Sequence, residues 1–145
     1  NYIHYEISNF SKKNKKCDHN LHYWRLEPYL AFGPGAHGFD GIKRWWNKKS
    51  IDYYLNKLEN NELPIESEEI LSPKDAFNET IMNGLRLIEG AKIKKLNSYL
   101  DMDITEHLEP YMEKWPYINN NGKNLTVKKE GLLFTDEIIT DLFLI

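Results

Sequence analysis

The spacing of hydrophobic and polar positions changes along this chain of 145 residues, and each change marks a predicted element. Residues 2–7 alternate in part between apolar and polar side chains and are rich in β-forming residues, so they predict a strand. The lysine-rich run at 11–16 predicts a solvated loop, and the apolar run at 29–32 predicts a second, buried strand. Residues 33–35, Gly-Pro-Gly, predict a turn, because glycine allows positive φ and close approach of the backbone.

From residue 50 onward the apolar positions follow helical spacing. Apolar residues recur at i, i+3, i+4 and i+7 between residues 51 and 58, and Ser50 is placed to cap the helix that they predict. The acidic stretch at 66–69 predicts a linker. A second helix is predicted to begin after Ser72, which precedes a proline at the first helical position, and to continue to residue 88, with Gly90 after its end.

The last third of the chain mixes helix and strand signals. Residues 93–100 predict a short helix, and Asp103 is placed to cap another. Residues 117–127 predict an antiparallel hairpin around an Asn-Asn-Gly turn, 132–134 predict a further strand, and Thr135 begins a final helix. This order predicts an α+β fold whose later part is a mainly helical, winged-helix-like module with a small antiparallel hairpin. The predicted core comprises Leu55, Leu58, Phe77, Ile81, Leu85, Leu96, Leu108, Trp115, Leu132, Ile138 and Leu142.

Charge and composition narrow the classes of partner. The chain holds 19 Lys and Arg against 22 Asp and Glu, a net charge of −3, so no overall positive field attracts nucleic acid or an anionic membrane. The predicted final helix carries Asp136, Glu137 and Asp141, which would repel phosphates, and we therefore predict no nucleic-acid partner. No apolar run reaches the length of a membrane span, so we predict no integral membrane segment.

Cys17 is the only cysteine, so the chain can form no internal disulfide and no thiolate-ligated iron–sulfur cluster or zinc site of its own. Cys17 and His19 could reach one metal ion, but no third or fourth ligand accompanies them. A single free thiol fits a reducing compartment, and we expect a cytoplasmic location. The chain starts in a strand-like run and not with Met, so we expect it to be part of a longer protein.

Candidate chemistry concentrates between residues 19 and 37, which hold three of the five histidines. A neutral imidazole at His19 could bind iron, and the flat side chains of Tyr23 and Trp24 suit a planar macrocycle beside it. The alternative is a histidine that is hydrogen-bonded within a folded loop, with Tyr23 and Trp24 in the core. His22 is the weaker candidate, because in an extended segment its side chain points away from Tyr23, to the side of Asn20.

Two further patterns have both a ligand-binding and a structural explanation. Gly33 and Gly35 could present backbone N–H groups to an anion, although the spacing of a nucleotide-binding loop is absent. The structural alternative is a tight turn from strand to loop. Arg44, Trp45 and Trp46 could form a stacking platform for a base or a ring, or the tryptophan pair could seal the contact between two packed units, which we favour. His107 is expected on the polar surface of its helix.

Three motifs occur in order within the first 37 residues: Tyr-Glu-Ile-Ser-Asn-Phe at 5–10, His-Asn-x-x-Tyr-Trp at 19–24 and Gly-Pro-Gly-Ala-His at 33–37. In this order and at these gaps they resemble the HemW group of radical S-adenosylmethionine proteins, whose members are often described as oxygen-independent coproporphyrinogen III oxidase or its homologue. The later patterns at 83–90 and 131–135 are similar to the C-terminal domain of the same family. Gly38 departs from the serine that the family commonly carries there.

The resemblance implies a division of the chain, a ligand and a set of cofactors. Residues 1–46 would be the end of a radical SAM partial barrel, and residues 47–145 the helical C-terminal domain. Complete members hold a [4Fe–4S] cluster and S-adenosylmethionine through a CxxxCxxC motif, which is absent here, so we expect these cofactors only in a full-length parent. The His-Asn-x-x-Tyr-Trp motif is associated with the haem-chaperone branch. The candidate haem-binding residues are His19, Tyr23, Trp24, Gly33 and Gly35, with His19 as the ligand of the iron.

Three functions remain as hypotheses. The first is the C-terminal portion of a haem chaperone, which would bind haem or a porphyrin and meet a haem-accepting protein. The second is a fragment of an oxygen-independent coproporphyrinogen III oxidase of porphyrin biosynthesis, inactive alone because the cluster motif is missing. The third is a stand-alone winged-helix module for interaction or DNA binding, which the net charge disfavours.

Overall fold

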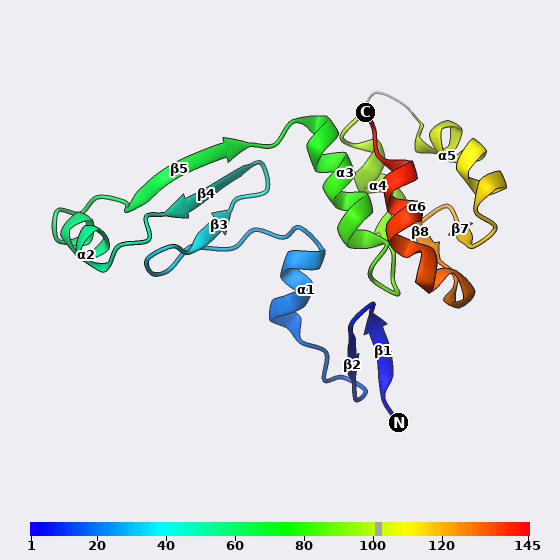
Figure 1. Cartoon of the computed structure of the whole chain (residues 1–145), viewed down its shortest axis with the longest axis horizontal. Coiled ribbons are helices and arrows are strands. Elements are labelled where there is room, and N and C mark those ends of the chain that lie inside the picture. The colour runs from blue at the N-terminus through cyan, green and yellow to red at the C-terminus, as the bar shows by residue number, and fades with distance from the viewer. Residues whose placement is uncertain (101–102) are drawn as a thin grey trace. The chain divides into compact units, whose positions relative to one another are not determined.

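The computed structural model describes residues 1–100 and 103–145 (Figure 1). Within these ranges the chain forms six α-helices, one 3-10 helix and eight short strands, which pair into three small antiparallel sheets. The predicted α+β class is confirmed. The residues fall into two compact units, one made of residues 1–25 and 72–145 and the other of residues 26–71.

The larger unit begins with a hairpin. The predicted first strand is confirmed as β1 (Ile3–Glu6), which pairs antiparallel with β2 (Asn9–Ser11), a strand that the sequence did not predict. The backbone after β1 also pairs with the segment after α3 (Pro73–Gly84), because the Ile7 N–H donates to the carbonyl of Arg86 at 2.9 Å. The hairpin is thereby tied to the rest of the unit.

The His-Asn-x-x-Tyr-Trp motif forms a helix, and neither the folded loop nor the extended segment considered from the sequence is present there. Helix α1 (Asp18–Trp24) has the backbone bonds of its type: the Leu21 N–H donates to the Cys17 carbonyl at 3.1 Å. The helix was not predicted because seven residues are too few to show a clear helical spacing of apolar positions. Its apolar residues Leu21 and Trp24 are three positions apart, which is compatible with a helix face but also with a loop. Contact of these two side chains with Tyr5 and Leu87 stabilises the helix.

The rest of the larger unit follows the predicted order of three helices, a hairpin and a closing helix. The predicted hairpin is confirmed, and residues 132–134 belong to a 3-10 helix and not to a strand. The elements are α3, β6 (Ala91–Lys92), α4 (Ile93–Asn97), α5 (Ile104–Lys114), β7 (Ile118–Asn120), β8 (Asn124–Val127), η1 (Lys129–Phe134) and α6 (Thr135–Leu142), with sheet order β6-β8-β7.

Two local features delimit α3. The Ser72 hydroxyl caps its start by accepting the Asp75 N–H at 3.1 Å, as predicted. The helix ends at Gly84, four residues before the predicted end, because the chain turns there to reach the sheet. Gly90 has φ of +78°, and a Cβ atom on it would lie 2.2 Å from the Leu125 carbonyl oxygen. Only glycine fits this position, which brings β6 beside β8.

The core of the larger unit is apolar and surrounds α3. Seven predicted core residues are buried: Phe77, Ile81, Leu85, Leu96, Leu108, Ile138 and Leu142. Trp115 and Leu132 are half-buried. Leu55 and Leu58 are 51% and 46% exposed, so their prediction as core residues was wrong.

The smaller unit contains a three-stranded sheet and one helix. Its strands are β3 (His37–Phe39), β4 (Lys43–Asn47) and β5 (Ile65–Ile70), in the order β3-β4-β5, and α2 (Ile51–Glu59) is capped by Ser50 as predicted. The predicted strand at 29–32 is absent apart from an isolated bridge between Tyr29 and Phe39. The predicted acidic linker at 66–69 lies in β5.

The compact units divide the chain differently from the predicted domains 1–46 and 47–145. The predicted boundary falls inside β4. The assignment of residues 1–46 to the end of a barrel stays a prediction.

Candidate functional site

Helix α1 carries the exposed candidate residues on one face. The side chains of His19, His22 and Tyr23 are exposed, and positions i, i+3 and i+4 of a helix are neighbours on its surface. The rings of His19 and Tyr23 meet edge to face, with centroids 5.1 Å apart and an angle of 88° between their planes. The prediction that the His22 side chain points away from Tyr23 was wrong, because it holds only for an extended backbone and this segment is helical.

The opposite face of α1 fixes the helix in its unit. Leu21 is 3% exposed and forms a small cluster with Tyr5 and Leu87, against which Trp24 packs. Trp24 is half-buried, so much of its indole serves this packing. The structure therefore separates the motif into an exposed pair, His19 and Tyr23, and a supporting residue, Trp24.

The C-terminal end of α1 is anchored by charged groups. The Arg25 guanidinium donates two hydrogen bonds to Glu89, from Nε to Oε1 at 2.8 Å and from Nη2 to Oε2 at 3.0 Å. Lys95 Nζ donates to the Arg25 carbonyl at 2.8 Å. The hydrogen bond from Arg25 lowers the pKa of Glu89 below its ordinary value of 4.5, against the opposing effect of partial burial. This two-pronged contact holds the end of α1 in a defined geometry.

The first motif is used within the fold. Glu6 is fully buried, and its carboxylate accepts the Ser8 N–H at 3.0 Å and the side-chain amide of Asn9. Glu6 and Asn9 therefore close the β1–β2 hairpin, which explains the acid at position 6 and the asparagine at position 9, whereas Ser8 contributes its backbone N–H. This role of Glu6 was not predicted, and its only signal in the sequence is an acid inside a strand-like run.

Gly33 and Gly35 lie in the smaller unit, whereas His19, Tyr23 and Trp24 lie together on α1 of the larger one. The Gly33 N–H donates to the Tyr54 hydroxyl at 3.1 Å, and the Gly35 N–H donates to the Lys48 carbonyl at 3.1 Å. These N–H groups are the donors that an anion would need. The geometry thus favours the second explanation of this segment, a tight turn held by its neighbours.

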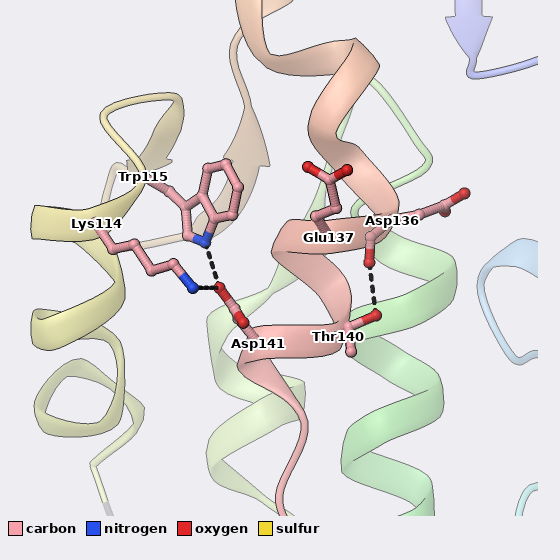
Figure 2. Close-up of a pocket in the computed structure, with 6 residues that line it drawn as sticks. All are labelled: Lys114, Trp115, Asp136, Glu137, Thr140 and Asp141. Atoms are coloured by element: carbon pink, nitrogen blue, oxygen red, sulfur yellow. Dashed lines mark hydrogen bonds and ion pairs between the residues drawn. The ribbon is translucent and has the colours of Figure 1, made fainter.

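A pocket of about 510 Å³ lies between the end of α5 and helix α6 (Figure 2). Asp141 Oδ2 accepts hydrogen bonds from Lys114 Nζ and from Trp115 Nε1, both at 2.6 Å. These bonds lower the pKa of Asp141, with Lys114 as the larger cause. Figure 2 also shows the Thr140 hydroxyl donating to the Asp136 carbonyl, at 2.8 Å. The polar groups of this pocket thus connect α5 to α6.

The remaining predicted surface residue has a structural role. His107 is half-buried, its Nε2 lies 3.2 Å from the Leu142 carbonyl oxygen, and its ring contacts Phe77 and Tyr111. The prediction that it lies on the polar surface was wrong, because Leu142 at the end of α6 and Phe77 of α3 contact that side of α5.

The residues present do not fit a radical SAM cluster. A [4Fe–4S] cluster needs several cysteine thiolates, and the chain has one, Cys17, whose side chain is exposed. Among residues 1–100 and 103–145 no group of three or more His, Cys, Asp or Glu side chains is placed to hold a metal ion.

Comparison with known proteins identifies the relatives of this chain. Residues 71–134 match the family model described as HemN C-terminal domain. The chain is 30% identical over 138 residues to the Heme chaperone HemW of Mycobacterium tuberculosis (strain CDC 1551 / Oshkosh), in a match that covers 95% of this chain and 34% of that protein. The chain belongs to the HemW/HemN family. The suspected family is thereby confirmed.

Other relatives agree with this assignment. The Heme chaperone HemW of Synechocystis sp. (strain ATCC 27184 / PCC 6803 / Kazusa) is 32% identical over 162 residues, which cover 97% of this chain and 39% of that protein. That of Bacillus subtilis (strain 168) is 30% identical, with 92% and 36% covered. The chain thus spans between a third and two fifths of the length of these relatives.

A solved structure shares the fold. The coproporphyrinogen III oxidase HemN of Escherichia coli, described as a radical SAM enzyme, superposes with a TM-score of 0.64 over 97% of this chain and 37% of that one, at 12% sequence identity. No helix in the described part of this chain combines the length and the apolar character that crossing a membrane requires.

Proposed function

We propose that this chain is the C-terminal portion of a haem chaperone of the HemW type, and that helix α1 presents His19 as an axial ligand to the haem iron. The observation that carries the proposal is the exposed imidazole of His19 on a helix whose other face is packed and anchored. Haem is the cargo in this proposal and not a resident cofactor.

The chemistry of the α1 face supports the proposal. A neutral imidazole nitrogen is a common axial ligand of haem iron. The side chain of His19 is exposed, and no residue among 1–100 and 103–145 forms a hydrogen bond or an ion pair with its ring. The Tyr23 ring stands at right angles beside it and offers an apolar edge to a flat ligand. The relatives named as haem chaperones point to the same cargo.

Several finer expectations remain part of the proposal. Residues 1–46 would complete a partial barrel in a full-length parent, where the cluster and S-adenosylmethionine would also lie. Residues 47–145 would form the winged-helix-like C-terminal domain, and the sheet order β6-β8-β7, which joins a short strand to the hairpin, supports this expectation. A cytoplasmic location and a haem-accepting partner protein stay predictions. The alternative of an oxidase fragment has support from the fold alone.

The test is a haem titration of the chain followed by absorbance. We expect a Soret band that is lost or shifted in His19→Ala and retained in His22→Ala, which removes an imidazole one helical turn away on the same face. Binding to the isolated chain is expected to be weak, because no barrel encloses the ligand.

Trp24→Ala should weaken haem binding without changing the spectral type, since it loosens α1 and leaves the imidazole in place. Equal affinity and an identical spectrum for His19→Ala would show that His19 is not the ligand. Loss of the band in His22→Ala alone would assign the iron to His22 instead.

A further inference from the structure

The smaller unit contains an apolar pocket of its own, of about 410 Å³. It lies between the segment before Gly33, the sheet and helix α2, and every residue that lines it belongs to residues 26–71. Its apolar wall includes Phe32 and Leu63, which are 79% and 74% exposed. Exposed apolar side chains of this size around one hollow are typical of a binding surface.

Hydrogen bonds hold the walls of this pocket in place. Asn47 is 2% exposed, and its Nδ2 donates to the Gly33 carbonyl at 3.0 Å. The Tyr54 hydroxyl of α2 accepts the Gly33 N–H at 3.1 Å. The segment that carries Phe32 is therefore held at its end from two sides, by the sheet and by the helix. Its apolar side chains are presented by a fixed backbone, which lowers the entropic cost of binding.

One wall of the pocket is an indole that lies across a glycine. Trp45 lines the pocket and pairs with Gly38 on the neighbouring strand β3. A Cβ atom on Gly38 would lie 2.3 Å from two ring carbons of Trp45, so any other residue there would displace the indole. The absence of a side chain at Gly38 makes room for this aromatic wall.

The charges at the pocket are already partnered. Asp40 Oδ1 accepts the N–H groups of Ile42 and Lys43, at 2.9 and 2.6 Å, and these bonds lower the pKa of Asp40. Lys43 Nζ forms an ion pair with Glu68 at 3.0 Å. The positive charge of Lys43 is thus balanced by Asp40 and Glu68. This balance disfavours a ligand that would bind here through its own carboxylates. The pocket suits an uncharged, flat and apolar group.

We propose that this pocket binds the apolar edge of a porphyrin ring through contacts that do not require iron. The choice of a porphyrin rests on the function proposed above, since the ring of the cargo is flat and carries its carboxylates at one edge only. The opposite edge is apolar and packs against Trp45 and Phe32, and the carboxylates stay in water. The chain then contacts the ring in the smaller unit by a mode separate from ligation at His19.

The test is a titration of the 145-residue chain with iron-free protoporphyrin IX, followed by porphyrin absorbance and fluorescence. This probe cannot be ligated through iron, so it reports ring contacts alone. We expect saturable binding that Phe32→Ser weakens about tenfold, because one large apolar contact is lost. Phe32 is exposed, so this substitution leaves the fold intact. Trp45→Leu should weaken binding to a similar degree.

Two matched variants serve as controls. Trp46→Leu removes the same side chain from the next position of β4, which faces the other side of the sheet. Ile42→Ser removes an apolar side chain that is 68% exposed in the same unit and does not line the pocket. Both should bind the probe like the unchanged chain.

The outcomes separate this inference from the proposed function. Absence of binding by the iron-free ring, or equal weakening by the pocket variants and the controls, would overturn the pocket assignment, while a haem band dependent on His19 would leave the proposed function standing. Pocket-dependent binding of the iron-free ring, together with a haem spectrum unchanged in His19→Ala, would support the pocket and reject His19.

Discussion

At the scale of residues, Glu6 illustrates how a carboxylate that could take part in chemistry instead stabilises the fold through its hydrogen bonds. A carboxylate that is fully buried must have partners, and here they are the backbone N–H of Ser8 and the amide of Asn9. Gly38 shows the reverse, because a residue with no side chain decides where the Trp45 indole lies. Neither role can be read from residue type alone, since each depends on a neighbour that the backbone brings close.

The hydrogen bonds of Glu6 predict a measurable loss of stability. Glu6→Ala should lower the free energy of unfolding by about 1–3 kcal/mol, because two hydrogen bonds to a buried, charged carboxylate are lost. Urea denaturation of the two proteins measures the difference. The control is Glu130→Ala, which removes an exposed carboxyl in η1 and should change the free energy of unfolding by less than about 0.5 kcal/mol. Similar losses in both variants would show that the partners of Glu6 contribute nothing specific.

At the scale of elements, the sequence predicted those whose signals are local. Helices α2, α3 and α5 were found because Ser50, Ser72 and Asp103 cap them, and the hairpin of β7 and β8 because an Asn-Gly turn joins two short apolar runs. Elements stabilised by distant contacts were missed. Helix α1 depends on Tyr5 and Leu87, and β5 depends on pairing with β4 despite its acidic residues.

The candidate site residues also divide into those with a local sequence signal and those that only the fold brings together. His19 and Tyr23 were predicted from a short motif, but their common face with His22 required knowledge that the segment is a helix. The apolar pocket of the smaller unit was not predicted, because residues 32, 45 and 63 meet only through the fold. The two aromatic residues of β4 were noticed, yet alternation along the strand assigns them opposite faces, and only Trp45 lines the pocket.

The anchoring of α1 predicts a pH dependence at the element scale. Arg25 lowers the pKa of Glu89 in the folded protein, so the ionised carboxylate stabilises the fold above its ordinary pKa of 4.5. This contribution is lost as the pH falls through the lower, folded-state pKa. We expect Glu89→Gln to be less stable than the unchanged chain near neutral pH and the difference to shrink steadily below about pH 4.5.

Urea denaturation across this pH range measures the difference, with Glu130→Gln as the control, since Glu130 is an exposed carboxyl of the same unit. The test rests on the sign of the stability difference between the two proteins and not on its size. Arg25 and Glu89 are both partly exposed, and solvent weakens the attraction between them. A stability difference that grows on acidification would contradict the assigned role of Glu89.

At the scale of the whole molecule, the chain spans between a third and two fifths of its haem-chaperone relatives. Its two compact units carry different parts of the proposed chemistry, an exposed imidazole on α1 and an apolar pocket beside β4. Neither part includes a set of thiolates. The proposed haem chemistry can therefore be examined in this chain apart from radical chemistry, which would need residues that it does not contain.

The last prediction follows from this separation. The purified chain, offered iron and sulfide without oxygen, should assemble no [4Fe–4S] cluster and cleave no S-adenosylmethionine, because a cluster of this kind needs several thiolates and Cys17 is the only one. Absorbance in the visible range, together with iron and sulfide content per chain, measures the first, and formation of 5′-deoxyadenosine the second. The same preparation should still give a haem spectrum that depends on His19. A stoichiometric cluster in the monomer would contradict the cysteine argument, whereas a cluster shared by several chains would disappear in Cys17→Ser and be traced to association.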